Sequence, residues 1–131
     1  MNDIISVLKM NELVFDNISF SRKGFKNNNP PKYKLESHFA KNQLEDIYRV
    51  SLLLDCDKED EYTINIKLTG YFSFDSKENI DEQEKNELIT KNAVAIIMPY
   101  MRSQISLLTA QPNVDCIVLP PFNINNFIKD N

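Results

Sequence analysis

The sequence predicts an α+β fold in which a four-stranded antiparallel sheet packs against one long kinked helix, with a short helix at the C-terminus. Two patterns carry this prediction. Apolar and polar residues alternate over most of residues 7–74, and apolar residues recur at helical spacing over residues 88–108. The chain has 131 residues, which fits a single domain over residues 1–131 with a sizeable core.

Composition argues against several classes of function. The chain has 15 basic and 19 acidic residues, so a nucleic-acid partner or an anionic membrane surface is disfavoured. One histidine and two distant cysteines argue against a zinc site, and two glycines argue against a Gly-rich phosphate loop. The N-terminus lacks the basic region of a signal peptide, and no apolar stretch is long enough to span a membrane. We therefore expect a cytoplasmic protein with no cofactor, no metal and no membrane insertion.

The first strand is expected at residues 7–20. Leu13 and Phe15 break the parity of its other apolar residues, which predicts a bulge or a switch of the buried face. The polar, acid-free residues 21–34 follow, and their Asn-Asn-Asn-Pro-Pro run is incompatible with a helix or a central strand. We interpret this stretch as a crossover loop, which is either a solvated connection or a gate with a basic contact surface.

Three further strands are expected at residues 33–39, 47–55 and 62–74. The last of them is the clearest, because its apolar residues share one parity and its polar residues the other. The acidic residues 55–61 predict a hairpin tip. They lack the glycine and the terminal glutamate spacing of a calcium-binding loop, so a solvated turn is favoured.

A long helix is expected after residue 76, opened by acidic residues that complement its positive end. Pro99 should kink it, and Pro112 should end it. Between residues 93 and 101 almost every direction around the helix is apolar. Because a helix on one sheet needs only one apolar stripe, we expect a second subunit to cover the other side. The residues assigned to this oligomer interface are Ile64, Ile66, Leu68, Val94, Ile97 and Met101.

After the helix, a double proline should hold the chain extended, and Asn123 should cap the short last helix. No catalytic motif stands out. His38 is the only imidazole, and the sequence offers no nucleophile or orienting acid for it. The chain is therefore not expected to be an enzyme.

Residues 92–111, NAVAIIMPYMRSQISLLTAQ, and residues 118–127, VLPPFNINNF, resemble the C-terminal half of the SecB export-chaperone family. Residues 16–22 resemble the family's first strand and residues 70–74 its fourth, so the resemblance covers almost the whole chain. Its core is fairly specific, because an interior helical proline beside tyrosine and arginine is uncommon. The matching motif positions are Asn92, Pro99, Tyr100, Arg102, Leu119, Pro121 and Asn123.

The resemblance implies a homotetramer, built as a dimer of dimers with the long helices between two composite sheets. It also implies an ATP-independent holdase, a chaperone that keeps unfolded polypeptide clients from aggregating in long apolar grooves and uses no cofactor. Each residue that lines the groove by position could equally be ordinary core. These client-groove positions are Tyr33, Leu35, Leu119, Phe122, Phe127 and Ile128.

The sequence departs from the family at the acidic patch that docks the translocase motor SecA. The matching positions are Asn17, Ser21 and Asn65, all uncharged, which puts the electrostatic part of motor docking in doubt. This departure favours a dedicated client, such as an antitoxin, over general export without deciding between them. The alternative function is a structural or assembly subunit that reuses the fold for protein–protein contact, and a small-molecule enzyme is the weakest hypothesis.

Overall fold

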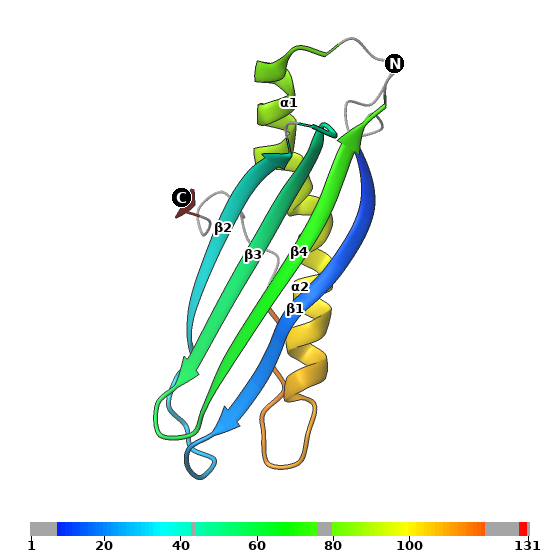
Figure 1. The fold of residues 1–131 in the computed structure, drawn as a ribbon. Coiled ribbons are helices and arrows are strands. Elements are labelled where there is room, and N and C mark those ends of the chain that lie inside the picture. Colours follow the sequence, from blue (N-terminus) through cyan, green and yellow to red (C-terminus); the bar gives the residue numbers. More distant parts are fainter. Residues whose placement is uncertain (1–7, 43, 76–79, 120–128, 131) are drawn as a thin grey trace.

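The computed structural model describes residues 8–42, 44–75, 80–119 and 129–130. Long antiparallel strands form a twisted sheet, and a helical segment crosses one of its faces (Figure 1). The expected α+β fold with four antiparallel strands and one long helix is confirmed. The strands are β1 (Leu8–Arg22), β2 (Lys32–Asn42), β3 (Ile47–Lys58) and β4 (Tyr62–Phe74), in the spatial order β1-β4-β3-β2, with the two-residue β5 (Lys129–Asp130) parallel to β2.

Two β-bulges keep most apolar residues of β1 on the inner face of the sheet, and Val14, opposite Thr69, is the exception. The register against β4 slips between Met10 and Glu12 and again between Phe15 and Asn17. Each slip restores the buried face after the parity has changed. Leu13 and Phe15 therefore contact the core together with Met10. The irregularity predicted from the sequence, a bulge or a switch of the buried face, is a bulge on each side of Leu13 and Phe15.

The core lies between the inner face of the sheet and the helical segment. Leu52 and Phe72 on the sheet and Ile105 on the helix are fully buried in it. Gly70 marks a close approach of the two layers, because a Cβ there would come within 2.8 Å of the Phe72 ring and 3.1 Å of Ile97. Among the described residues, no helix is long and apolar enough to cross a membrane.

The helical segment has three parts, α1 (Glu82–Leu88), the π-helical turn η2 (Ile89–Ala93) and α2 (Val94–Thr109). The Asp81 carboxylate caps α1 by accepting a hydrogen bond from the Glu84 N–H at 2.8 Å, so the acidic helix start is confirmed. The π-turn was not predicted. Pro99 lies inside α2, and a bend at this residue stays a prediction.

The connection between β3 and β4 is shorter than predicted. β3 continues to Lys58, so residues 55–58 of the expected acidic tip are strand and the tip is confined to residues 59–61. The prediction was wrong because cross-strand and loop partners hold these acids within the strand: Asp55 accepts a hydrogen bond from the Asn65 amide at 2.6 Å, and Asp57 forms an ion pair with Lys23. The short helix expected after Asn123 falls on residues 123–128, which lie outside the described residues.

Candidate functional site

The crossover loop spans residues 23–31 and is shorter than the predicted 21–34, because residues 21–22 belong to β1 and residues 32–34 to β2. It joins β1 and β2, which lie on opposite sides of the central strands β4 and β3 (Figure 1). A buried ion pair anchors this loop. The Lys58 ammonium lies 2.6 Å from the Glu61 carboxylate, and both side chains are almost completely buried. The Asn27 N–H donates to the same carboxylate oxygen at 3.0 Å, and the Lys58 ammonium donates to the Asn27 carbonyl at 2.7 Å. The pair therefore fixes the course of the loop over the end of the sheet.

Burial acts to raise the pKa of Glu61, but hydrogen bonds from Lys58 and Asn27 outweigh it and lower the pKa below its ordinary value of 4.5. We expect Glu61→Gln to lower the free energy of unfolding by about 3 kcal/mol, because the Lys58 charge loses its buried partner. Because the folded-state pKa is depressed, the carboxylate stabilises the fold above about pH 4.5 and loses this effect as pH falls through the lower folded-state value.

Urea unfolding at pH 7 and pH 3 measures both effects. The gap between the wild type and Glu61→Gln should narrow at pH 3, whereas the exposed Glu59→Gln should match the wild type at pH 7. Equal stability of the wild type and Glu61→Gln at pH 7 would contradict the anchoring role.

Three of the cations around the loop are engaged within the chain. Lys23 pairs with Asp57 at 2.6 Å and Lys26 with Asp115 at 3.0 Å. The Arg22 guanidinium donates to two backbone carbonyls at 3.0 Å each. These intramolecular contacts do not favour the interpretation of the loop as a basic contact surface.

The segment after α2, residues 110–119, runs back along the helix side of the sheet (Figure 1). Hydroxyl groups near the end of α2 hold it at Ile117. Thr109 accepts a hydrogen bond from the Ile117 N–H at 2.8 Å, and Ser106 donates to the Ile117 carbonyl at 2.7 Å. Residues 111–114 form a turn, and burial alternates over residues 117–119 that follow it. Leu119 is buried in the core, and Val118 is 76% exposed.

The crossover loop and the segment after α2 border a hollow of about 380 Å³, which we call the client hollow. Tyr33 and Val118 place apolar surface beside open solvent there, Tyr33 being 40% exposed. Burial raises the pKa of Tyr33, so its phenol is neutral at physiological pH. The hollow is lined by Asn27, Asn28, Asn29 and Pro31 of the loop, Tyr33, Lys58 and Tyr62 of the strands, and Asp115, Cys116, Ile117 and Val118 of the segment after α2.

Of the six residues assigned to the groove, the structure places Tyr33 in the wall of the client hollow. Leu35 and Leu119 are buried in the core of the chain, and their contact with a client stays a prediction. Phe122, Phe127 and Ile128 lie outside the described residues. Val118 was not predicted from the sequence, although its place between the apolar residues Ile117 and Leu119 in the segment expected to be extended is a signal for it.

The six residues assigned to an oligomer interface all lie between the sheet and the helix of one chain. Each is at most 2% exposed, so a contact between copies of the chain would involve other side chains of α2. The outer side of α2 carries Tyr100, Ser103 and Leu107, of which Tyr100 is 47% and Leu107 70% exposed. The interface residues are Ile64, Ile66 and Leu68 on β4 and Val94, Ile97 and Met101 on α2.

The three positions of the expected motor-docking face lie on the outer face of the sheet, which is turned away from the helix. The Asn17 amide donates to the Asn65 carbonyl at 3.3 Å, and Ser21 lies opposite Thr63 in the register. Asn17 lies opposite Lys67, so a cation adjoins this uncharged patch.

The motif residues divide between the helix and the C-terminal segment. Asn92 lies in η2, and Pro99, Tyr100 and Arg102 lie in α2. Pro121 and Asn123 fall outside the described residues.

A family model described as preprotein translocase subunit SecB matches residues 4–130. The chain belongs to the SecB family. The resemblance found in residues 92–111 and 118–127 is thereby confirmed. SecB-family chaperones are non-enzymatic, in agreement with the lack of a catalytic motif.

The fold is similar to that of a SecB-like chaperone of Mycobacterium tuberculosis, solved in complex with a peptide from the HigA1 antitoxin. The TM-score is 0.74 over 92% of this chain and 91% of that chain, at 12% sequence identity, so the similarity shows the fold alone. An uncharacterized protein of Methanocaldococcus jannaschii is 36% identical over 61 residues. These are 47% of this chain and 37% of the relative, so the match spans about a third of that protein.

Proposed function

We propose that this SecB-family chain is a cytoplasmic, ATP-independent holdase that binds unfolded polypeptides. The observation that carries the proposal is the client hollow, where Tyr33 and Val118 expose apolar surface between the anchored loop and the segment after α2. Burial of apolar surface is non-directional, so such a wall suits clients of many sequences. Each 100 Å² that a client covers contributes about 2.5 kcal/mol before the cost of ordering it.

The edge of β2 supports binding of an extended client. Among the described residues, β5 pairs with β2 only at Glu36 and Ser37. An extended client beside Tyr33 can therefore add hydrogen bonds to those backbone groups on the edge of β2 that no described residue pairs, while its side chains enter the client hollow.

The test is the aggregation of a chemically unfolded, slowly refolding protein, followed by light scattering with and without this chain. We expect suppression that is the same in the absence and presence of ATP. A lack of suppression at a several-fold molar excess of the chain, or a strict requirement for ATP, would contradict the proposal.

We propose further that the chain serves a dedicated client, such as an antitoxin, rather than general export. Two observations support this proposal. The M. tuberculosis chaperone, whose fold is similar, was solved with an antitoxin peptide, and the patch at Asn17, Ser21 and Asn65 is uncharged. Exposed carboxylates attract a basic partner through long-range forces that salt screens, so their absence should weaken docking of the motor SecA.

The triple change Asn17→Asp, Ser21→Glu and Asn65→Glu should tighten SecA binding and make it sensitive to salt. Each added charge contributes up to about 1 kcal/mol at an exposed site. The contribution of Asn65→Glu should be the smallest, because Asp55 lies beside this position. Titration calorimetry against the cognate SecA measures the change. Tight, salt-sensitive binding by the unmodified chain would contradict the dedicated client and support general export.

We also propose that the chain assembles as a homotetramer, a dimer of dimers. The exposed apolar residues of α2, Tyr100 and Leu107, support a contact between helices. They lie on the side of α2 that the chain's own sheet does not cover.

A further inference from the structure

The outer face of the sheet carries a second hollow, of about 390 Å³, on the opposite side of the sheet from the helix. Its lining includes Asp16, Arg49, Ser51, Lys67, Thr69 and Tyr71. We call it the outer hollow. It shares no lining residue with the client hollow.

The floor of the outer hollow is polar and closely hydrogen-bonded. The hydroxyl groups of Ser51 and Thr69 lie 2.9 Å apart, and Thr69 donates to the Asp16 carboxylate. Thr69 is 2% and Ser51 6% exposed, which is unusual for residues on the solvent side of a sheet. The second bulge of β1 places Asp16 over this pair, so the one carboxylate in the lining has a partner within the chain.

Two cations, Arg49 and Lys67, flank this floor. Arg49 precedes Ser51 by two residues on β3, and Lys67 precedes Thr69 by two residues on β4, so both share the face of the floor. Among the residues that the structure describes, neither lies within ion-pair distance of a carboxylate. Lys34, on the same face of β2, does have one, because its ammonium lies 2.9 Å from Glu36.

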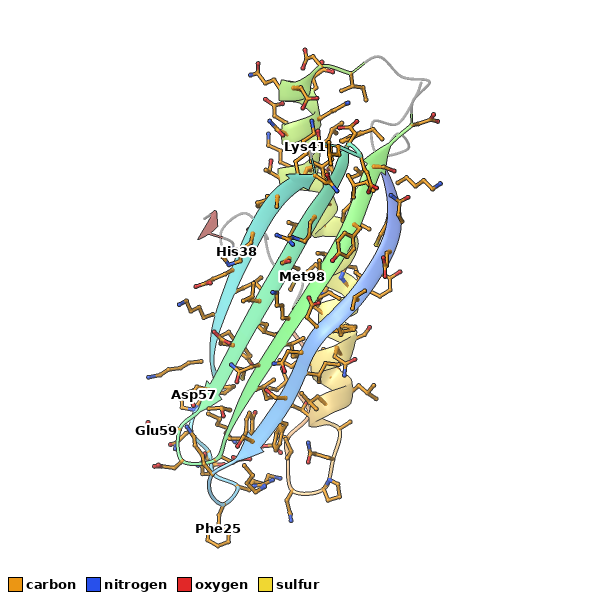
Figure 2. All side chains as sticks on the ribbon, in the orientation of Figure 1. Phe25, His38, Lys41, Asp57, Glu59 and Met98 are labelled. Atoms are coloured by element: carbon orange, nitrogen blue, oxygen red, sulfur yellow. The ribbon has the colours of Figure 1, made fainter. Side chains whose placement is uncertain are left out.

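The lining of the outer hollow holds two cations against one carboxylate, Asp16, so it keeps an excess of positive charge that the other charged groups around it do not cancel. His38 lies opposite Ser51 in the register, at the edge of the outer face (Figure 2), and its ring lies 3.7 Å from the Glu36 carboxylate. Glu36 is shared with Lys34, and Asp55 accepts a hydrogen bond from the Asn65 amide.

We propose that the outer hollow binds an acidic side chain of an extended peptide segment from a partner protein. The carboxylate lies between Arg49 and Lys67, and the apolar surface of Leu53 and Tyr71, which also line the hollow, contacts the neighbouring residues of the segment. The guanidinium of Arg49 suits this role because it can donate two parallel hydrogen bonds to one carboxylate.

The shape and charge of the neighbouring surface favour a short acidic segment over a polyanion. A further hollow of about 480 Å³ also contains Arg49 and Tyr71, so the two together form a trough along the strands. Glu12 and Glu45 line this further hollow, and Glu12 lies opposite Tyr71 in the register. They would repel the phosphates of a nucleic acid, whereas a peptide with one or two acidic residues avoids them.

Fluorescence anisotropy with two labelled peptides tests the proposal. The probe Gly-Glu-Val-Glu-Leu-Gly should bind the intact chain at least tenfold more tightly than Gly-Gln-Val-Gln-Leu-Gly at low ionic strength, and the difference should shrink as salt rises. The double variant Arg49→Gln, Lys67→Gln should abolish the difference. Both side chains are exposed, so the variant should keep the unfolding midpoint of the wild type.

Two control variants locate the site. Lys34→Gln removes a paired cation from the same face and should leave the preference for the glutamate peptide unchanged. The change Tyr33→Asp, Val118→Asp in the client hollow should also leave it unchanged. Equal affinity for both peptides, or a preference that survives the Arg49, Lys67 double variant, would overturn the proposal. A preference lost only with the client-hollow variant would overturn it as well.

Discussion

Placing a carboxylate at both Tyr33 and Val118 should abolish the suppression of aggregation by this chain. The two side chains form the exposed apolar wall of the client hollow, at 40% and 76% exposure. A client would have to bury two charges there, and an unpaired buried charge costs several kcal/mol. Because both positions are open to solvent in the free chain, we expect the free energy of unfolding to change by less than about 1 kcal/mol.

The matched control is Leu44→Asp, which changes a side chain that is 95% exposed in the turn between β2 and β3, away from the client hollow. It should suppress aggregation as well as the wild type. Full suppression by a folded Tyr33→Asp, Val118→Asp variant would show that clients bind elsewhere on the chain.

The double variant Tyr100→Asp, Leu107→Asp should dissociate the proposed tetramer into smaller species without unfolding the chain. Both residues lie on the outer side of α2, away from the core, and an assembly across this side would bury both carboxylates without partners. A charge at Ile66 would not separate dissociation of the assembly from unfolding of the chain, because Ile66 is 2% exposed within one chain and the charge would disrupt its core.

Light scattering coupled to size-exclusion chromatography measures the mass, and circular dichroism verifies the fold. The wild type and Leu44→Asp should have four times the mass of one chain. A wild type that remains monomeric at micromolar concentration would contradict the proposed assembly, and an unchanged tetramer of the Tyr100, Leu107 variant would exclude the outer side of α2 from it.

The sequence was most informative where one face of an element is buried and the other is solvated. β4 has the bounds predicted for it, Tyr62–Phe74, because a one-residue slip would expose its whole apolar row. The parity break at Leu13 and Phe15 predicted a bulge in β1 for the same reason. The acids after residue 76 predicted the opening of a helix through the helix dipole, but not its start at Glu82 or the cap at Asp81.

The sequence was least informative where a feature depends on contacts between distant residues. The anchor of the crossover loop joins Asn27 to Lys58 and Glu61, and no local pattern links these residues. The apolar pattern of the helix also could not separate the side that packs on the chain's own sheet from the side that remains open, so six core residues were assigned to an interface. The π-turn at Ile89–Ala93 has no local signal that we recognise.

The most direct test of the proposed function is equilibrium binding of a permanently unfolded protein, prepared by reduction and carboxymethylation, measured by titration calorimetry without nucleotide. We predict saturable binding of the unfolded form, no binding of the same protein in its native disulfide-bonded form, and loss of binding with Tyr33→Asp, Val118→Asp. Absence of binding to the unfolded form, or equal binding to the native form, would contradict the account of this chain as a holdase.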